Sequence, residues 1–311
     1  MRATRRELLL GGAAGGAAAA CASLKQRPSY QGGRSPWPIC MDTATLRPQT
    51  LEKKIEVAAA AGFDAIEPWD GELRDYERAG GDLKDLGMKI RDAGLFVPSV
   101  IGLWDAIPAT RGAWEAQLPH TRERLRMFSA VGSEQAQVIP GPARPAAEFD
   151  RVWVAERYHD LLEIGINDYG IVPGLVFVDF LEGCKRLSQA MDIAIQSQHP
   201  EARVIPDVFH MHIGGSGFEG LGHMDGDAIA IFQFNDAPAS PPMGELKDSH
   251  RVFPGDGILP LEKSLRDLRD IGFERCISLE LYNPSYWERE PLGVAREGLE
   301  KTLGVIERAL A

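Results

Sequence analysis

Several residue types and patterns are scarce in this 311-residue sequence, and each scarcity excludes a class of protein. Cysteine occurs four times. Three cysteines follow Cys21, namely Cys40, Cys184 and Cys276. Their odd number and wide spacing exclude a disulfide framework. Positive charge is also short, with 34 Lys and Arg against 45 Asp and Glu. The net charge of −11 leaves no electrostatic attraction to nucleic acid or to an anionic membrane.

Two organising patterns are missing as well. No G-x-G-x-x-G follows the first predicted strand, which argues against a dinucleotide site. We find no internal repeat and no sign of a second domain. The 44% of hydrophobic residues is ample for one large core, and α/β barrels reach this length as a single domain.

The N-terminal residues show the ordered features of a twin-arginine (Tat) export signal. Arg5 and Arg6 precede Leu8–Ala20, a run of only Leu, Gly and Ala that is too short to span a bilayer. We therefore predict that residues 1–25 are a signal peptide, that the Tat translocase is a partner, and that the protein is periplasmic or otherwise exported. A disordered tail is the alternative. Cys21 is a candidate lipid anchor, although the usual aliphatic residue three positions earlier is absent.

After a Pro-, Gly- and Ser-containing linker at 26–36, strand-like and helix-like stretches alternate through 37–311. Thr50 is expected to cap the first helix and Gly62 to end it. The strand-like stretches are expected at 37–41, 63–69, 95–103, 137–140, 171–178, from 204, 229–234 and 276–281. Strict alternation of eight such pairs predicts a single (β/α)₈ TIM barrel.

Oxygen- and nitrogen-bearing side chains follow several of these strands at their carboxyl ends, where active sites of such barrels lie. Carboxylate and amide oxygens at one point suit a divalent ion such as Mg²⁺ or Mn²⁺. Such an ion would polarise a sugar carbonyl and stabilise an enediolate, while a carboxylate moves the proton. The candidates at these strand ends are Glu67, Asp207, His210, Gln233, Asp236 and Glu280.

Five short motifs occur at these strand ends in order: IEPW (66–69), PDVFH (206–210), FQFNDAP (232–238), HRVFPGDG (250–257) and SLELYN (278–283). With them, the chain from residue 37 onward resembles the sugar phosphate isomerase/epimerase family of xylose isomerase-like TIM barrels. Each motif alone is weakly specific, whereas five in order are fairly specific for the family and not for a substrate.

The resemblance implies metal ligands at Asp207, Gln233 and Glu280. The ion would be Mn or Mg, with Zn or Co as further options, and weakly held. It also implies that His210 and Arg251 contact substrate oxygens.

We expect Glu280 to be the catalytic base and His210 to assist it. Glu67 is expected to order the substrate site. Trp69 would stack on a sugar ring, with ordinary packing under the loops as the alternative.

One position departs from the family pattern. Relatives carry a Glu near the end of strand five as metal ligand and acid/base, and Val176 stands there in this chain. Val cannot ligate a metal or transfer a proton. Asp179 and Glu182 follow shortly afterwards, but the sequence does not show whether either side chain turns inward.

The residues and the resemblance together predict an exported enzyme that isomerises or epimerises a sugar or cyclic polyol at a carbon α to a carbonyl. A small-molecule carbohydrate is its expected partner, without nucleic acid. The sequence leaves the oligomeric state open, a homo-oligomer included. The alternatives are a lyase or hydrolase on keto-glycosides and, because of Val176, a catalytically decayed barrel that only binds sugars.

Overall fold

The computed structural model describes residues 29–311. The predicted signal peptide at 1–25 and Cys21 lie outside the described residues. The described part of the predicted linker contacts the barrel. Gln31 Nε2 donates to the Gly62 carbonyl at 2.9 Å and to Asp64 Oδ2 at 2.7 Å, and Arg34 forms ion pairs with Glu300 and Glu307 of the last helix.

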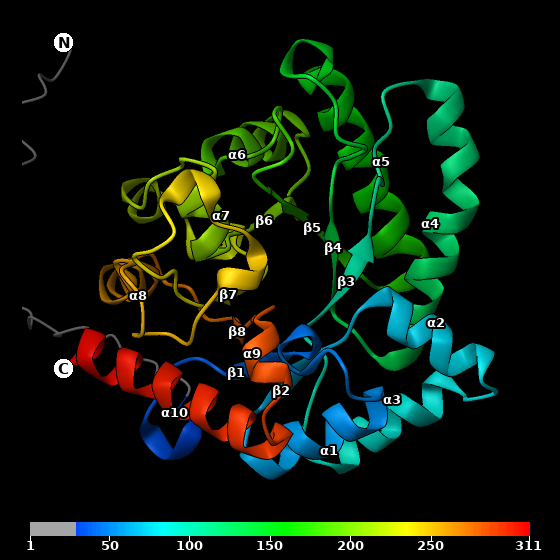
Figure 1. Ribbon diagram of the computed structural model, residues 1–311. Helices are drawn as coiled ribbons and strands as arrows, with labels where there is room; N and C mark the ends of the chain where they lie inside the picture. Colours follow the sequence, from blue (N-terminus) through cyan, green and yellow to red (C-terminus); the bar gives the residue numbers. More distant parts are fainter. Residues whose placement is uncertain (1–28) are drawn as a thin grey trace, which may run out of the picture.

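Short parallel strands form the centre of the molecule (Figure 1). They form two four-stranded sheets, in the orders β2-β1-β8-β7 and β3-β4-β5-β6. Parallel bridges join the two sheets at both edges, at Ala65–Phe96 and at Val204–Ile229. The strands are β1 (Ile39–Asp42), β2 (Ala65–Glu67), β3 (Ser99–Leu103), β4 (Gln135–Val138), β5 (Val172–Val176), β6 (Arg203–Ile205), β7 (Phe232–Phe234) and β8 (Ile277–Leu279). The predicted (β/α)₈ barrel is confirmed.

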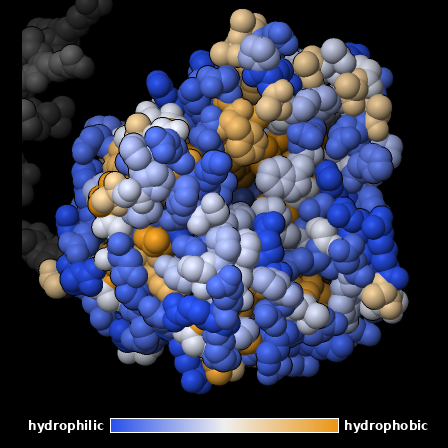
Figure 2. Space-filling model, viewed as in Figure 1, coloured by the Kyte–Doolittle hydropathy of each residue, from blue (hydrophilic) through white to orange (hydrophobic). Residues whose placement is uncertain are grey.

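Helices surround these strands, and the last helix packs against the first and the eighth (Figure 1). They are α1 (Leu51–Ala61), α2 (Asp70–Arg78), α3 (Leu83–Asp92), α4 (Arg111–Val131), α5 (Arg151–Tyr169), α6 (Leu187–Gln196), α7 (Val208–Ile213), α8 (Leu261–Asp270), α9 (Pro284–Trp287) and α10 (Pro291–Leu310). Among the described residues, no helix is both long and apolar enough to cross a membrane. Figure 2 shows a mostly hydrophilic face with scattered hydrophobic residues.

Local signals set the first helix as expected. The Thr50 side chain accepts from the Lys53 N–H at 3.3 Å, and Gly62 ends α1 with a φ of 97°, which an L side chain rarely adopts. Helix α2 was not predicted, because its sequence is almost entirely polar and only Asp70 and Leu73 are buried. A helix with so narrow an apolar stripe gives little periodic signal.

The alternation of strand side chains determines what faces the barrel interior. A Cβ added at Gly174 would lie 2.9 Å from both the Ala230 and the Ile205 side chains, so residue 174 faces inward. Val176, two residues later in β5, therefore faces inward as well. In β8, the Ser278 side chain bonds to inward-facing Glu67, so the same alternation turns Glu280 toward the interior.

Candidate active site

The predicted carboxylates meet at the carboxyl ends of the strands. Glu67 is the last residue of β2, Glu280 follows β8 directly, and Asp207 lies two residues beyond β6. Gln233 lies within β7 and pairs with Asp207 through a parallel bridge. All four are at most 3% exposed. The structure therefore brings these predicted residues into one buried region.

Asp207 is placed by the turn from β6 into α7. Its Oδ1 accepts from the Phe209 N–H at 2.7 Å and from the His210 N–H at 3.2 Å, which caps the helix. This cap directs the other carboxylate oxygen, Oδ2, toward Arg251. The turn therefore positions Asp207 and His210 together.

Arg251 lies between the two main carboxylates. Its Nη1 donates to Asp207 Oδ2 at 2.5 Å and to Glu280 Oε2 at 2.7 Å. Asp248 Oδ1 accepts from Nη2 at 2.7 Å and from Nε at 3.2 Å, and the His210 Nε2 lies 3.1 Å from Nη2. All five N–H groups of the guanidinium therefore face an acceptor.

This arrangement indicates where substrate could contact Arg251. Three of its four acceptor atoms belong to residues that are at most 6% exposed, whereas the Asp248 side chain is 43% exposed. Substrate oxygens would gain access to Arg251 by replacing Asp248, which would release the Nε and one Nη2 donor.

His210 also approaches a carboxylate after strand five. Its Nδ1 lies 3.3 Å from Asp179 Oδ1, a distance that fits an ion pair, but the atoms do not meet hydrogen-bond geometry. The imidazole lowers the pKa of Asp179. Asp179 thus turns toward the site, whereas Glu182 pairs with Lys185 at 2.8 Å and has a side chain 52% exposed.

Glu67 forms a second network just below. It accepts from Gln137 Nε2 at 2.6 Å and from the Ser278 hydroxyl at 2.8 Å. Gln233 Nε2 lies 3.5 Å from Gln137 Oε1 and joins this network. Burial raises the pKa of Glu67 to about 7, against the opposing effect of these hydrogen bonds. Glu67 thus links β2 to β4 and β8 inside the barrel, and its expected role in ordering the substrate site stays a prediction.

Asp42, the last residue of β1, was missed from the sequence. Its side chain is fully buried, Oδ1 accepts from the Ala44 N–H and from Trp69 Nε1, and Oδ2 has no hydrogen-bond partner in the described part of the chain. Burial and the nearby Glu67 raise its pKa well above the usual range. The predicted strand stopped one residue short, at 41, although Asp42 ends it like the other site residues.

Trp69 packs within an aromatic group. Its ring stacks on Trp104 at 5.7 Å between centroids and meets Tyr282 edge-on at 6.0 Å, with the Arg47 guanidinium 5.0 Å above it. A cavity of about 240 Å³ lies beside it, lined in part by Arg47 and Lys54. Trp69 therefore lines this cavity while its Nε1 donates to Asp42, and its predicted stacking on a sugar stays a prediction.

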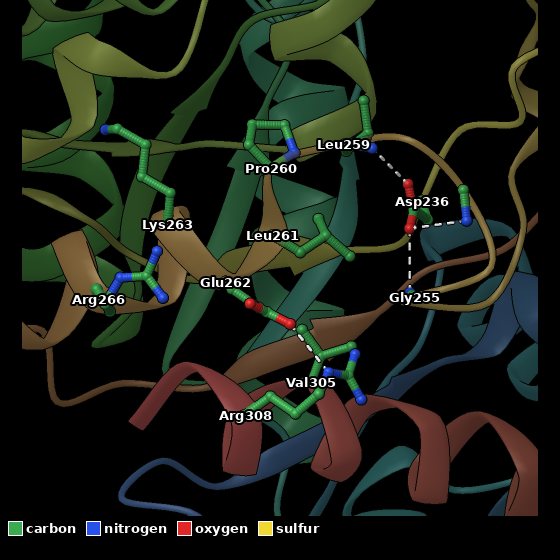
Figure 3. Close-up of a pocket in the computed structure, with 11 residues that line it drawn as sticks. Asp236, Gly255, Leu259, Pro260, Leu261, Glu262, Lys263, Arg266, Val305 and Arg308 are labelled. Atoms are coloured by element: carbon green, nitrogen blue, oxygen red, sulfur yellow. Dashed lines mark hydrogen bonds and ion pairs between the residues drawn. The ribbon is translucent and has the colours of Figure 1, made fainter. Parts of the chain in front are cut away.

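Asp236, the other strand-seven candidate, holds a loop. Its carboxylate accepts from the N–H groups of Ala237, Gly255, Gly257 and Leu259 at 2.8–3.0 Å. Figure 3 shows the bonds from Gly255 and Leu259. A Cβ at Gly257 would lie 2.3 Å from the Asp236 Oδ1, so only glycine allows this approach. Asp236 therefore has a structural role.

The proton distribution differs between the two carboxylates that share Arg251. Burial alone would raise the pKa of Asp207, but the charges of Arg251 and His210 outweigh it and lower the pKa to about 2. Burial raises the pKa of Glu280 well above its usual range despite Arg251. The Tyr282 hydroxyl donates to Glu280 Oε1 at 2.6 Å. Asp207 thus remains ionised, and Glu280 is the group that can hold or release a proton.

The residues implied as metal ligands do not form an open ligand set. Arg251 joins Asp207 and Glu280, and Gln233 belongs to the Glu67 network. In the part of the chain from 29 to 311, no three His, Cys, Asp or Glu side chains are grouped so that they could hold a metal ion. As placed, these residues do not fit a resident divalent ion.

The arrangement can support proton transfer. Glu280 is a buried carboxyl with a raised pKa, beside a cation that cannot lose its proton. A positive charge at this position stabilises negative charge that develops on a nearby substrate oxygen.

Comparisons with known proteins agree with this fold. The chain is 34% identical to an inosose isomerase of Bacillus licheniformis over 141 residues, 45% of this chain and 50% of that protein. It is 23% identical to a 3-dehydroshikimate dehydratase of Pseudomonas putida over 262 residues, 83% of this chain and 40% of that protein. The chain thus spans about half the length, or less, of the curated relatives it matches.

A solved structure extends the comparison to the fold. A crystal structure of the IolI protein with a bound zinc atom superposes with a TM-score of 0.79 at 22% identity, covering 88% of this chain and 99% of that chain. The family model described as "Xylose isomerase-like TIM barrel" matches residues 55–304. The chain therefore belongs to the xylose isomerase-like TIM barrel family.

Proposed function

We propose that this protein is an isomerase or epimerase that moves a proton at a carbon α to a carbonyl of a sugar or cyclic polyol. Glu280 is the base in this proposal. The observation that carries it is the position of Glu280 at the end of β8, buried, with a raised pKa, between Arg251 and Tyr282.

The chemistry requires a base whose pKa is near the working pH and a positive charge close to the developing enediolate. Glu280 has a pKa raised by burial, and Arg251 Nη1 is 2.7 Å from it. Asp207 stays ionised and keeps the guanidinium in place at 2.5 Å. The inosose isomerase of B. licheniformis supports a cyclic keto-polyol as substrate class.

Substrate access requires movement of the loops after β5 and β7. Asp207 and Arg251 are fully buried, whereas the side chains of Asp179 and Asp248 are 39% and 43% exposed. Displacing Asp248 by two substrate oxygens would leave the pairs with Asp207 and Glu280 intact. His210 would then lie beside the bound oxygens.

A dehydratase is the second candidate, because elimination begins with the same proton abstraction. It also needs an acid that protonates the leaving hydroxyl. Asp42 suits this role, since its pKa is raised by burial and its Oδ2 has no hydrogen-bond partner among residues 29–311. The 3-dehydroshikimate dehydratase of P. putida, which matches 83% of this chain, supports this alternative.

The similar IolI structure with zinc is the reason to consider a divalent ion here. The side chains of this chain do not fit one as they stand, so the proposed steps use only Glu280, Arg251, His210 and their partners.

Solvent-deuterium incorporation tests the proposal. The mature chain in D₂O is incubated with inososes, ketohexoses and 3-dehydroshikimate, and NMR follows exchange at the α carbon. We expect exchange or isomerisation with at least one polyol substrate, retained in Glu262→Gln, an exposed control on α8 paired with Arg308. Elimination products alone would favour the dehydratase. Ligand binding without exchange would contradict both and support a decayed sugar-binding barrel.

We also propose that residues 1–25 direct export. The support is the order of Arg5, Arg6 and the run Leu8–Ala20. A reporter that must fold before export, fused to residues 1–30, should cross the membrane and stop doing so after Arg5→Lys with Arg6→Lys. Export that survives this double substitution would contradict the proposal.

A further inference from the structure

We propose that Arg251 is the resident cation of this site, and that its guanidinium stands where a divalent ion would have to bind between Asp207 and Glu280. The inference concerns the same site as the proposed function, but it rests on geometry and is tested by ion binding rather than turnover.

The carboxylate oxygens of Asp207 and Glu280 already accept hydrogen bonds from protein donors. Asp207 Oδ1 caps α7 through two backbone N–H groups, and Oδ2 accepts from Arg251. Glu280 Oε2 accepts from Arg251, and Oε1 accepts from the Tyr282 hydroxyl. All four oxygens have a donor, so an ion would have to displace Arg251 to reach both residues.

Neither Val176 nor Gln233 supplies an anionic ligand beside Asp207 and Glu280. Val176, in β5, faces the barrel interior with a buried, apolar side chain that cannot ligate an ion. Gln233 is neutral and turned toward Gln137. With Arg251 present, the pair Asp207 and Glu280 is already partly neutralised, and a second cation beside the guanidinium would be repelled.

Arg251 is also held in place by aromatic rings and by a hydrogen bond to its backbone. Its guanidinium lies 5.0 Å from the Phe209 ring and 4.9 Å from the Tyr282 ring, and Asn283 Nδ2 donates to its carbonyl at 3.0 Å. All of its N–H groups have partners, and arginine does not deprotonate in proteins. Moving it aside would break charged hydrogen bonds to two buried carboxylates.

The consequence is a site whose positive charge is part of the chain. It would be insensitive to chelators, and it would bind a substrate oxygen through N–H donors released by Asp248, not through open coordination positions.

The test begins with the wild-type chain and Mn²⁺ alone as probe. Binding to the folded state raises the melting temperature by mass action. We expect the same melting temperature in chelator and in about 1 mM Mn²⁺, and no one-to-one uptake in equilibrium dialysis. Stoichiometric uptake with a raised melting temperature would overturn the proposal, and this arm needs no variant to fold.

A double variant, Arg251→Met with Val176→Glu, removes the guanidinium and adds a carboxylate on the interior side of β5. We expect one Mn²⁺ to bind and to raise its melting temperature by about 5 °C or more. Val176→Glu alone should gain nothing, because Arg251 still bridges the pair. Arg308→Met, which removes an exposed arginine paired with Glu262, is the matched control and should not respond. A folded double variant that ignores Mn²⁺ would overturn the claim that Arg251 stands in an ion position.

Discussion

The two sides of the barrel mouth differ in what their strands place at the carboxyl ends. Strands β3, β4 and β5 end in Leu103, Val138 and Val176, all buried and apolar. On the other side, β1 and β2 end in Asp42 and Glu67, and Glu280 follows β8.

The difference shows that the ionisable side chains of this site gather on one side of the barrel mouth. Asp42, Glu67, Asp207 and Glu280 are four buried carboxylates, and within residues 29–311 the only arginine or lysine that forms an ion pair with any of them is Arg251. Burial must therefore keep some of them protonated, which is what the raised pKa values of Asp42 and Glu280 express. The charged side can thus hold a movable proton, and the β5 side cannot.

Removing the Arg251 guanidinium should cause the largest loss of stability. Arg251→Met would leave the ionised Asp207 buried without a counter-ion, which costs about 3–5 kcal/mol of unfolding free energy. Urea unfolding at neutral pH measures this loss. Arg308→Met should change stability by about 0.5 kcal/mol or less, because its ion pair is exposed. Equal losses in both variants would contradict the described network.

Neutralising Glu67 should alter the pH dependence of stability. Its pKa is raised from 4.5 to about 7 in the folded state, so the folded protein binds the proton more tightly. The wild-type unfolding free energy should therefore receive a contribution that falls as pH rises from about 4.5 to about 7 and is constant above. Glu67→Gln lacks this contribution. Relative to wild type, it should gain about 3 kcal/mol between pH 4.5 and pH 8.

Urea unfolding of both proteins across this range measures the change. A difference between the two that is independent of pH would contradict the assigned protonation of Glu67. The exposed Glu262→Gln should show no such trend and serves as control.

On the β5 side, adding a polar group should lower the unfolding free energy by a smaller amount. Val176→Thr keeps the shape of the side chain and buries a hydroxyl, which costs about 1–3 kcal/mol where no partner exists. Thermal or urea unfolding gives this number. A neutral or stabilising result would mean that polar groups of the site, such as Asp179, reach this position and that the two sides are less distinct.

Much of the fold was readable from the sequence, because hydrophobic periodicity and caps are local signals. Thr50 and Gly62 limit α1 as expected. Helix α2 escaped, since its polar sequence has almost no buried face. The apolar residues from Leu181 to Ile195 predict a helix over that range, whereas α6 begins at Leu187. Residues before it form a turn in which the Val178 N–H bonds to the Cys184 carbonyl.

The site was readable only in part. The ends of β2, β6 and β8 identified Glu67, Asp207 and Glu280, because parallel strands bring their carboxyl ends together. The role of Asp236 was not readable, since its four N–H partners come from a loop up to 23 residues away in sequence. The bridging position of Arg251 was equally hidden, because it depends on a contact 44 residues apart with Asp207 and 29 residues apart with Glu280.

The most direct measurement is α-proton exchange into D₂O by wild type and Glu280→Gln, each assayed in chelator and in Mn²⁺. The account predicts that wild type exchanges equally in both conditions and that Glu280→Gln is slower by a factor of roughly 10²–10⁴ in both. Unchanged exchange in Glu280→Gln would contradict the assignment of the base. Wild-type exchange that stops in chelator and returns with Mn²⁺ would contradict the role of Arg251 as the resident cation.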